Sequence, residues 1–146
     1  MIRRIKHEER EDSDKWLEEF MPLYERANPF IQKIIKIDAD TDSATVKSFV
    51  AAVREGYQEL SLILRCVKAI PKPKEKELSK LMADFESVLI NCLGVSQCAR
   101  QLAGKQSRFT PPKFTLAKLV SWAGMAKGRM EDCSKILASV SREDSL

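Results

Sequence analysis

The sequence has few of the residues that interrupt helices or form tight turns. It contains five glycines and six prolines in 146 residues, whereas an all-β chain needs many turns. No apolar run approaches the ~18 residues that suggest a membrane-spanning helix. The first residues, MIRRIKHEEREDSDKW, are charged and lack the apolar segment of a secretory signal. We therefore expect a helical, cytoplasmic protein without a membrane span.

Residues with acid–base or metal chemistry are also scarce. The only histidine is His7; the chain has no Glu-x-x-His iron motif, and no Ser-His-Asp triad is evident. No Cys-x-x-Cys pair and no glycine-rich phosphate loop occurs. We therefore predict no catalytic residue, no metal site and no cofactor, and hence no enzyme activity.

The four cysteines all lie in apolar, helix-like stretches, which is typical of a reduced compartment. Cys92 and Cys133 fall on apolar stripes and are predicted to be small buried groups. Cys66 and Cys98 lie beside the stripes, so a redox role for them stays open.

The bulk composition fits one soluble globular domain. Hydrophobic residues make up 44% and charged residues 32% of the chain. The net charge of +4 is weakly basic and does not by itself indicate nucleic-acid binding. We predict a charged, mobile arm over residues 1–12 and a single bundle domain over residues 13–141.

Three segments carry an apolar stripe in which steps of three and four residues alternate. Such a stripe is typical of helices that pack at shallow angles in a bundle. The stripe positions are 46, 50, 53, 57, 60, 64 and 67; then 78, 81, 85, 88, 92, 95, 99 and 102; then 116, 119, 123, 126, 130, 133, 137 and 140. Almost none of these residues is polar, which argues against a ligand site between the helices.

A fourth stripe, at the N-terminal side, contains two prolines. It runs through Trp16, Phe20, Leu23, Ala27, Phe30, Ile34 and Ile37. Pro22 and Pro29 share one row with Lys15 and Lys36, which is predicted to face water. The sequence thus predicts either one bent helix or a break near Asn28-Pro29, and the cost of two interior prolines slightly favours the break.

Short connections between the segments predict antiparallel neighbours. The predicted fold is an all-α, up-down antiparallel four-helix bundle. In that topology the acidic start of the chain shares one end with a basic patch at Lys72, Lys74 and Lys76. Asp38, Asp40 and Asp42 share the other end with Lys105, Arg108 and Lys113. Mutual neutralisation is the favoured interpretation of both ends, and a site for an acidic partner at the basic patch is the alternative.

Some apolar residues lie off the stripes and are candidates for binding a partner. Leu62 on one helix, and Ile90 and Leu93 on the next, are predicted to face outward. Together they would form a patch that accepts an amphipathic helix, with Arg65 and Lys80 flanking it. Homodimerisation through the same patch stays open.

Two features of the last helix have structural interpretations. Gly124 and Gly128 lie four residues apart, and close helix packing explains them better than a ligand. Trp122 lies at the edge of the stripe and is predicted to belong to the core.

The stretch VKSFVAAVREGYQELSLILRCVKAIPKPKEKELSKLMADF, followed by LAKLVSWAGM, resembles the N-terminal helical domain of cyclase-associated protein. The resemblance lies in a proline-containing turn, the Leu78-Ser79-Lys80-Leu81-Met82 segment and the Ser121-to-Met125 segment with its tryptophan. It covers roughly residues 20 to 125. The segments are also similar in length and order to focal-adhesion-targeting and vinculin-like four-helix bundles. These resemblances imply a cytoskeletal, actin-linked or signalling scaffold.

The sequence therefore predicts a non-enzymatic protein–protein interaction module. Its partner would be an amphipathic helix or an actin-associated protein, bound on the bundle surface. Two alternatives stay open: a bundle that binds a small molecule or cofactor, and a basic-loop binder of acidic membranes or nucleic acid.

Overall fold

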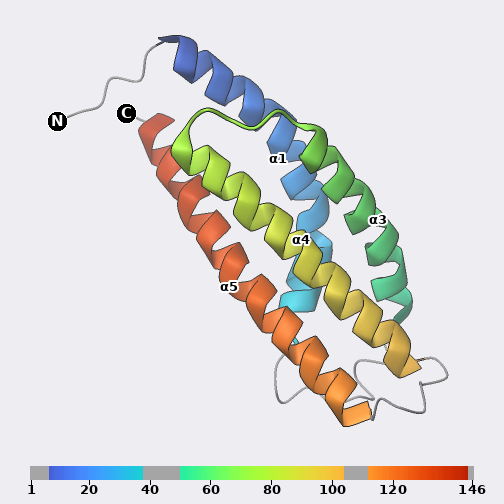
Figure 1. Cartoon of the computed structure of the whole chain (residues 1–146). Helices are drawn as coiled ribbons and strands as arrows, with labels where there is room; N and C mark the ends of the chain where they lie inside the picture. The colour runs from blue at the N-terminus through green and yellow to red at the C-terminus, as the bar shows by residue number, and fades with distance from the viewer. Residues whose placement is uncertain (1–6, 38–49, 104–111, 145–146) are drawn as a thin grey trace.

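In the described part of the chain, four α-helices form an up-down antiparallel bundle in the computed structural model (Figure 1). The helices are α1 (His7–Ile35), α3 (Val50–Ala69), α4 (Lys76–Ala103) and α5 (Pro112–Asp144). The structure describes residues 7–37, 50–103 and 112–144. Within these ranges the predicted all-α fold is confirmed, with α1 beside α3 and α5, and α4 between α3 and α5 (Figure 1).

The proline-containing segment forms one continuous helix rather than the slightly favoured break at Asn28. Pro22 and Pro29 both lie inside α1, which curves along its length (Figure 1). Both prolines are exposed, as are Lys15 and Lys36 in the same row. The carbonyls that the prolines leave without a helical donor therefore face solvent, where water can hydrate them. This explains how a helix with two interior prolines persists.

Helix α1 begins at His7, within the segment predicted as an N-terminal arm. Residues 7–12, which the sequence assigned to a charged arm, thus belong to α1, and α5 continues past residue 141 to Asp144. Residues 1–6 lie outside the described part of the chain.

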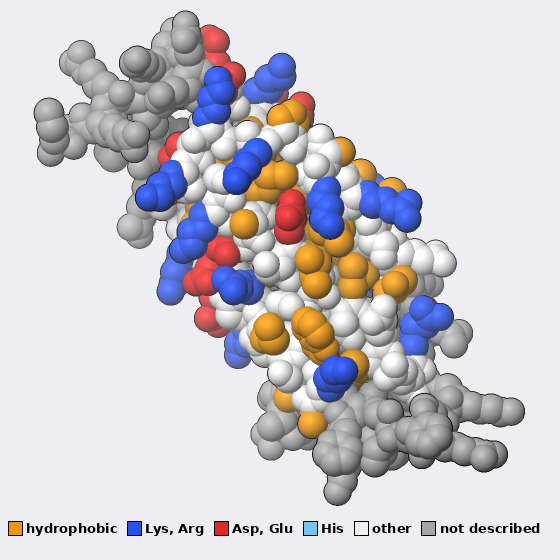
Figure 2. Space-filling view, viewed as in Figure 1, with side chains coloured by type: hydrophobic (Ala, Val, Ile, Leu, Met, Phe, Trp, Pro, Cys, Tyr) orange, Lys and Arg blue, Asp and Glu red, His pale blue; other side chains and the backbone are white. Residues whose placement is uncertain are grey.

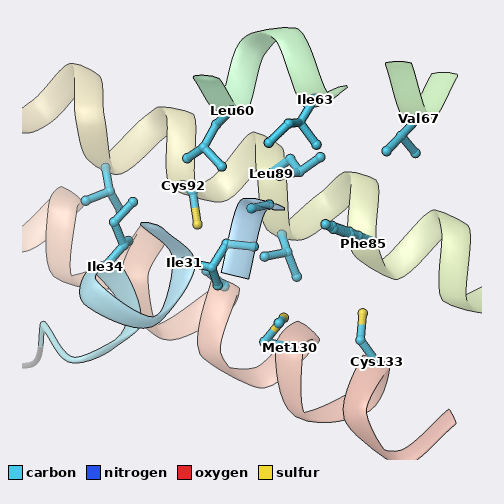
Figure 3. Close-up of a cluster of buried hydrophobic side chains, with 14 of the residues drawn as sticks. Ile31, Ile34, Leu60, Ile63, Val67, Phe85, Leu89, Cys92, Met130 and Cys133 are labelled. Atoms are coloured by element: carbon cyan, nitrogen blue, oxygen red, sulfur yellow. The ribbon is translucent and has the colours of Figure 1, made fainter. Parts of the chain in front are cut away.

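The apolar stripes form the core. Figure 3 shows Leu60 and Ile63 of α3 pointing toward Leu89 and Cys92 of α4, with Ile31 of α1 opposite them. On α4 and α5 the stripe positions from Leu78 to Ala99 and from Leu119 to Cys133 are buried. Burial of large side chains such as these contributes roughly 1.5–3 kcal/mol each. The predicted phase of these two stripes is confirmed.

On α3 the buried face is rotated slightly from the prediction. Ile63 is completely buried, whereas the stripe residues Tyr57 and Leu64 are only partly buried. On α1 the completely buried Ile31 lies beside the predicted stripe. The stripe positions before Val50 lie outside the described residues.

Helix α4 is buried over an unusually wide arc because it packs against all three other described helices. Three polar side chains on it are consequently buried, namely Asp84, Asn91 and Ser96. The Ser96 hydroxyl donates a hydrogen bond to the carbonyl oxygen of Cys92 at 3.0 Å, which satisfies it within its own helix. The apolar stripe did not predict the burial of these three polar residues, because they lie beside the stripe positions.

Candidate functional site

The predicted outward-facing residues divide into two groups. Leu62 and Ile90 are each 46% exposed, which is ordinary for a single apolar side chain and becomes informative only where several such side chains lie together. Leu93 is half-buried and packs against the core. Arg65 and Lys80 are exposed. Two of the three predicted apolar residues are therefore available to a partner.

The structure does not bring Leu62 and Ile90 into one patch. On α3, Tyr57 faces α4, because the Arg100 guanidinium of α4 lies 5.7 Å from its ring centroid. Glu59 faces α1, because it forms an ion pair with Arg26. At about 100° per residue, Leu62 lies roughly 60° from Glu59 and roughly 140° from Tyr57 around the helix axis. Leu62 therefore lies on the α1 flank of α3, away from α4.

The basic patch is partly neutralised, as the topology predicted. Lys72, Lys74 and Lys76 are exposed at the turn between α3 and α4. The Lys74 ammonium lies 3.8 Å from the Asp12 carboxylate of α1. Such an exposed pair contributes at most about 1 kcal/mol, but it brings acidic and basic elements together at this end. The charge pairs predicted for the opposite end lie outside the described side chains.

A different surface emerges where α4 meets α5. Gly94 of α4 lies against the Trp122 indole of α5, close enough that a Cβ on Gly94 would be 2.9 Å from the ring. A second contact joins Asp84, ten residues before Gly94 on α4, to Arg129, seven residues after Trp122 on α5. The Asp84 carboxylate lies 3.4 Å from the Arg129 guanidinium. These two contacts fix the antiparallel register of the helices.

This register places Ile90 and Met125 at the same level. Ile90 is four residues before Gly94, and Met125 is three residues after Trp122, so along the bundle axis they lie about 6 Å and about 4.5 Å from the Gly94–Trp122 contact, in the same direction. Met125 is 54% exposed and lies about one turn along α5 from each of the two α4-facing residues, Trp122 and Arg129. Sequence reasoning missed Met125, since its pairing with Ile90 depends on the register between two helices.

We call this surface the α4–α5 seam. Its apolar centre consists of Ile90, Met125 and the half-buried Trp122. Figure 2 shows hydrophobic side chains on the face where α4 and α5 lie in front of α1, surrounded by many Lys and Arg and fewer Asp and Glu side chains. The seam thus combines an apolar centre with a basic surround.

The charge on α4 and α5 is strongly one-sided at the surface. Where side chains are described, these helices expose seven basic residues but only two acidic ones, Glu77 and Glu131; the basic residues are Lys76, Lys80, Arg100, Lys118, Lys127, Arg129 and Lys135. Glu86 and Asp132 are half-buried, and Asp84 is buried. The exposed field is therefore positive, although the whole chain is only weakly basic.

Several titratable side chains lie close to the buried Asp84. Asp84 is 5% exposed, and its Oδ2 has no hydrogen-bond partner among the described residues. Burial raises the pKa of the neighbouring Cys133 thiol to about 12, and the charges of Asp84 and Asp132 act in the same direction. Burial also raises the pKa of Tyr24, whose hydroxyl is hydrogen-bonded to Ser134. The thiol and the phenol are thus neutral at physiological pH.

A surface depression lies away from the α4–α5 seam, between the C-terminal end of α1 and α5. It has a volume of about 440 Å³ and is lined by Gln32, Ile35, Lys36, Ile37, Val120, Gly124 and Lys127. None of the three buried polar side chains of α4 contributes to it. This depression is on the outside of the bundle, so it does not provide the cavity between helices that a buried cofactor would need.

Gly124 and Gly128 do not mediate close helix packing. A Cβ at either position would meet nothing within 4 Å, so the predicted interpretation is wrong for both glycines. Both are exposed, on the part of α5 that faces away from α4. Gly94 instead permits a close approach between α4 and α5, and Trp122 packs on the core as predicted.

The cysteines separate by burial. Cys92, Cys98 and Cys133 are buried and Cys66 is exposed, so the predicted burial of Cys92 and Cys133 is confirmed. Burial raises the pKa of Cys92 to about 12. Within the described ranges, no group of three His, Cys, Asp or Glu side chains could hold a metal ion. Over the same ranges, no helix combines the length and hydrophobicity needed to cross a bilayer.

Comparison of the chain with protein-family models, with curated proteins and with solved structures finds no match.

Proposed function

We propose that this bundle is a non-enzymatic protein–protein interaction module that binds its partner on an outer face. The observation that carries the proposal is the pair Ile90 and Met125, which are 46% and 54% exposed and lie level on adjacent helices. Scattered exposed leucines are ordinary, but two large apolar side chains at one level beside a half-buried tryptophan form a surface that gains free energy when covered.

The composition of this surface also supports a protein partner. Aromatic residues, methionine and arginine are enriched at the centres of protein interfaces, and Trp122, Met125 and Arg129 lie next to one another here. The resemblances to cytoskeletal and adhesion bundles favour an actin-associated or signalling partner in the cytoplasm.

The test is site-specific photo-cross-linking in an extract of cells that express the protein. A photoreactive residue would replace Leu62, Ile90 or Met125 in turn, and Glu18, an exposed polar residue of α1, would serve as the control position. Each cross-linked protein would be identified by mass spectrometry, purified and tested for direct binding.

We expect one defined protein to be cross-linked from an apolar position but not from position 18. An actin-associated protein at that position would support the cytoskeletal role. A pattern indistinguishable from that of position 18 at all three apolar positions would contradict the interaction-module proposal.

A further inference from the structure

We infer that the α4–α5 seam is a docking site for an acidic amphipathic helix of another protein. This inference rests on the proposed function and adds the place and the chemistry of the partner. It differs from the patch that the sequence predicted, because Leu62 lies on the α1 flank of α3 and Met125 takes its place.

The apolar centre has the size of a helix footprint. Ile90 and Met125 lie on opposite sides of the seam, and Trp122 lies one turn away from Met125 on α5. A partner helix lying along the seam would contact these side chains with apolar residues at positions i, i+3 or i+4, and i+7. Gly94 carries no side chain that would keep the partner away from this centre.

Basic residues lie beyond both ends of the apolar centre. Lys118 and Arg129 are both exposed, and each acts on a residue of α4: Lys118 acts electrostatically on Cys98, and Arg129 pairs with Asp84. They are eleven residues apart, so about 16 Å, or three helical turns, separates them along the axis. Lys80 extends the basic surface further along α4. A helix with acidic residues flanking two turns of apolar anchors would therefore match this spacing.

The secondary structure favours a helix over an extended peptide. An extended peptide binds most readily by adding to a sheet edge, and every element in the described part of the chain is helical. The surface between two antiparallel helices runs parallel to their axes and suits a third helix lying along it.

The charge distribution of the seam favours an acidic helix as the partner over a second copy of this chain. A symmetric dimer across the seam would bring the exposed Lys80, Lys118 and Arg129 of both copies together, and like charges at an interface are unfavourable. An acidic helix would pair with these groups instead. Nucleic acid would satisfy the charges but would leave Ile90 and Met125 exposed.

The inference can be tested with a displayed library of amphipathic helices of about 20 residues, in which the polar positions vary freely among acidic, basic and neutral residues. The library would be selected on the intact protein. Ile90→Glu is the test variant and Leu62→Glu is its matched control, since both residues are 46% exposed and both substitutions add one carboxylate. Circular dichroism would establish that both variants fold.

We expect the selected helices to be acidic and to lose about tenfold or more in affinity on Ile90→Glu, with less than about a twofold change on Leu62→Glu. Lys118→Glu should also weaken binding, whereas Lys72→Glu, far from the seam, should not. Raising the salt concentration from about 50 mM to about 500 mM should weaken binding further.

Three outcomes would overturn the inference: no enriched helix, enrichment of basic or neutral helices, or equal losses on Ile90→Glu and Leu62→Glu. The proposed function would survive any of these if photo-cross-linking still captured a partner from position 62. Conversely, if no position cross-linked a partner, the proposed function would fail even if the seam accepted displayed helices.

Discussion

Gly94 of α4 and Trp122 of α5 are in such close contact that no larger residue fits at position 94 without movement of the indole. A Cβ on Gly94 would lie 2.9 Å from Cδ2 and 3.0 Å from Cε2 of the ring. The approach of the two helices at this point brings Ile90 and Met125 to one level. The same contact therefore determines both the packing and the candidate binding surface.

Gly94→Ala is predicted to destabilise the bundle, although alanine is the better helix former. The substitution gains about 1 kcal/mol in helix propensity, but displacing the indole costs roughly 1–3 kcal/mol. The free energy of unfolding, measured with urea, should fall by about 1 kcal/mol.

Gly128→Ala is the matched control, because a Cβ there meets nothing within 4 Å. It should raise the free energy of unfolding by up to about 1 kcal/mol. Equal effects of the two substitutions would mean that the indole does not pack on Gly94.

The Asp84–Arg129 ion pair is predicted to stabilise the fold mainly because Asp84 is buried and its charge needs a partner. Arg129→Gln removes the cation and leaves a carboxylate that is 5% exposed, which should lower the free energy of unfolding by roughly 1–2 kcal/mol, since Arg129 itself is half-exposed. In an Asp84→Asn background the same substitution should cost less than about 0.5 kcal/mol. A double-mutant cycle measures this coupling, and additive effects would show that the two side chains do not interact.

Stability is predicted to fall as the pH rises above about 9. Burial raises the pKa of Cys92 from 9.0 to about 12, so between these values the thiol ionises in the unfolded chain but stays protonated in the fold. In this pH range the unfolded state binds fewer protons than the folded state. Each such thiol therefore lowers the free energy of unfolding by up to about 1.4 kcal/mol per pH unit.

Cys92→Ala should make this dependence shallower by about 1 kcal/mol per pH unit between pH 9 and pH 11, even if its lost packing lowers stability at pH 7. Urea unfolding at a series of pH values measures the slope. An unchanged slope would contradict burial of the thiol.

Pro29→Ala should stabilise the protein, because Pro29 is exposed and lies inside α1. Alanine restores the missing backbone donor and relieves the clash of the ring with the preceding turn, for an expected gain of about 1–3 kcal/mol. Thermal unfolding measures the gain. A lower melting temperature would indicate that the bend is required for packing, for instance of Phe30 on Gly56.

The sequence was sufficient to predict the bundle, because periodic burial depends on spacing within one helix. The stripes from Leu78 to Ala99 and from Leu119 to Cys133 were correct for this reason. The exposure of Leu62 and Ile90 followed from the same phase. A proline row facing water was also predicted, although the continuity of α1 was not the favoured alternative.

The candidate surface could not be predicted in full, because it depends on which neighbour lies on each flank of a helix. The phase of α3 places Leu62 outward, but only the ion pair between Glu59 and Arg26 shows that this flank faces α1. Likewise, only the Gly94–Trp122 contact shows that Met125 and Ile90 lie at the same height along their two helices. The burial of Asp84 reflects the three neighbours of α4, which a single stripe cannot indicate.

The most direct measurement uses Trp122 as a reporter of docking on the seam. The protein has two tryptophans, and Trp16→Phe, a conservative change at a buried ring stacked 4.5 Å from Phe20, leaves Trp122 as the only indole. The fluorescence of this variant would be followed while a selected acidic helix is added. The affinity would be measured in parallel by calorimetry.

We predict that the emission of Trp122 shifts to shorter wavelength and becomes protected from acrylamide quenching as the helix binds. The same change should occur with Leu62→Glu in the background and be lost with Ile90→Glu. Calorimetric binding without any change in the emission or quenching of Trp122 would contradict docking on the α4–α5 seam.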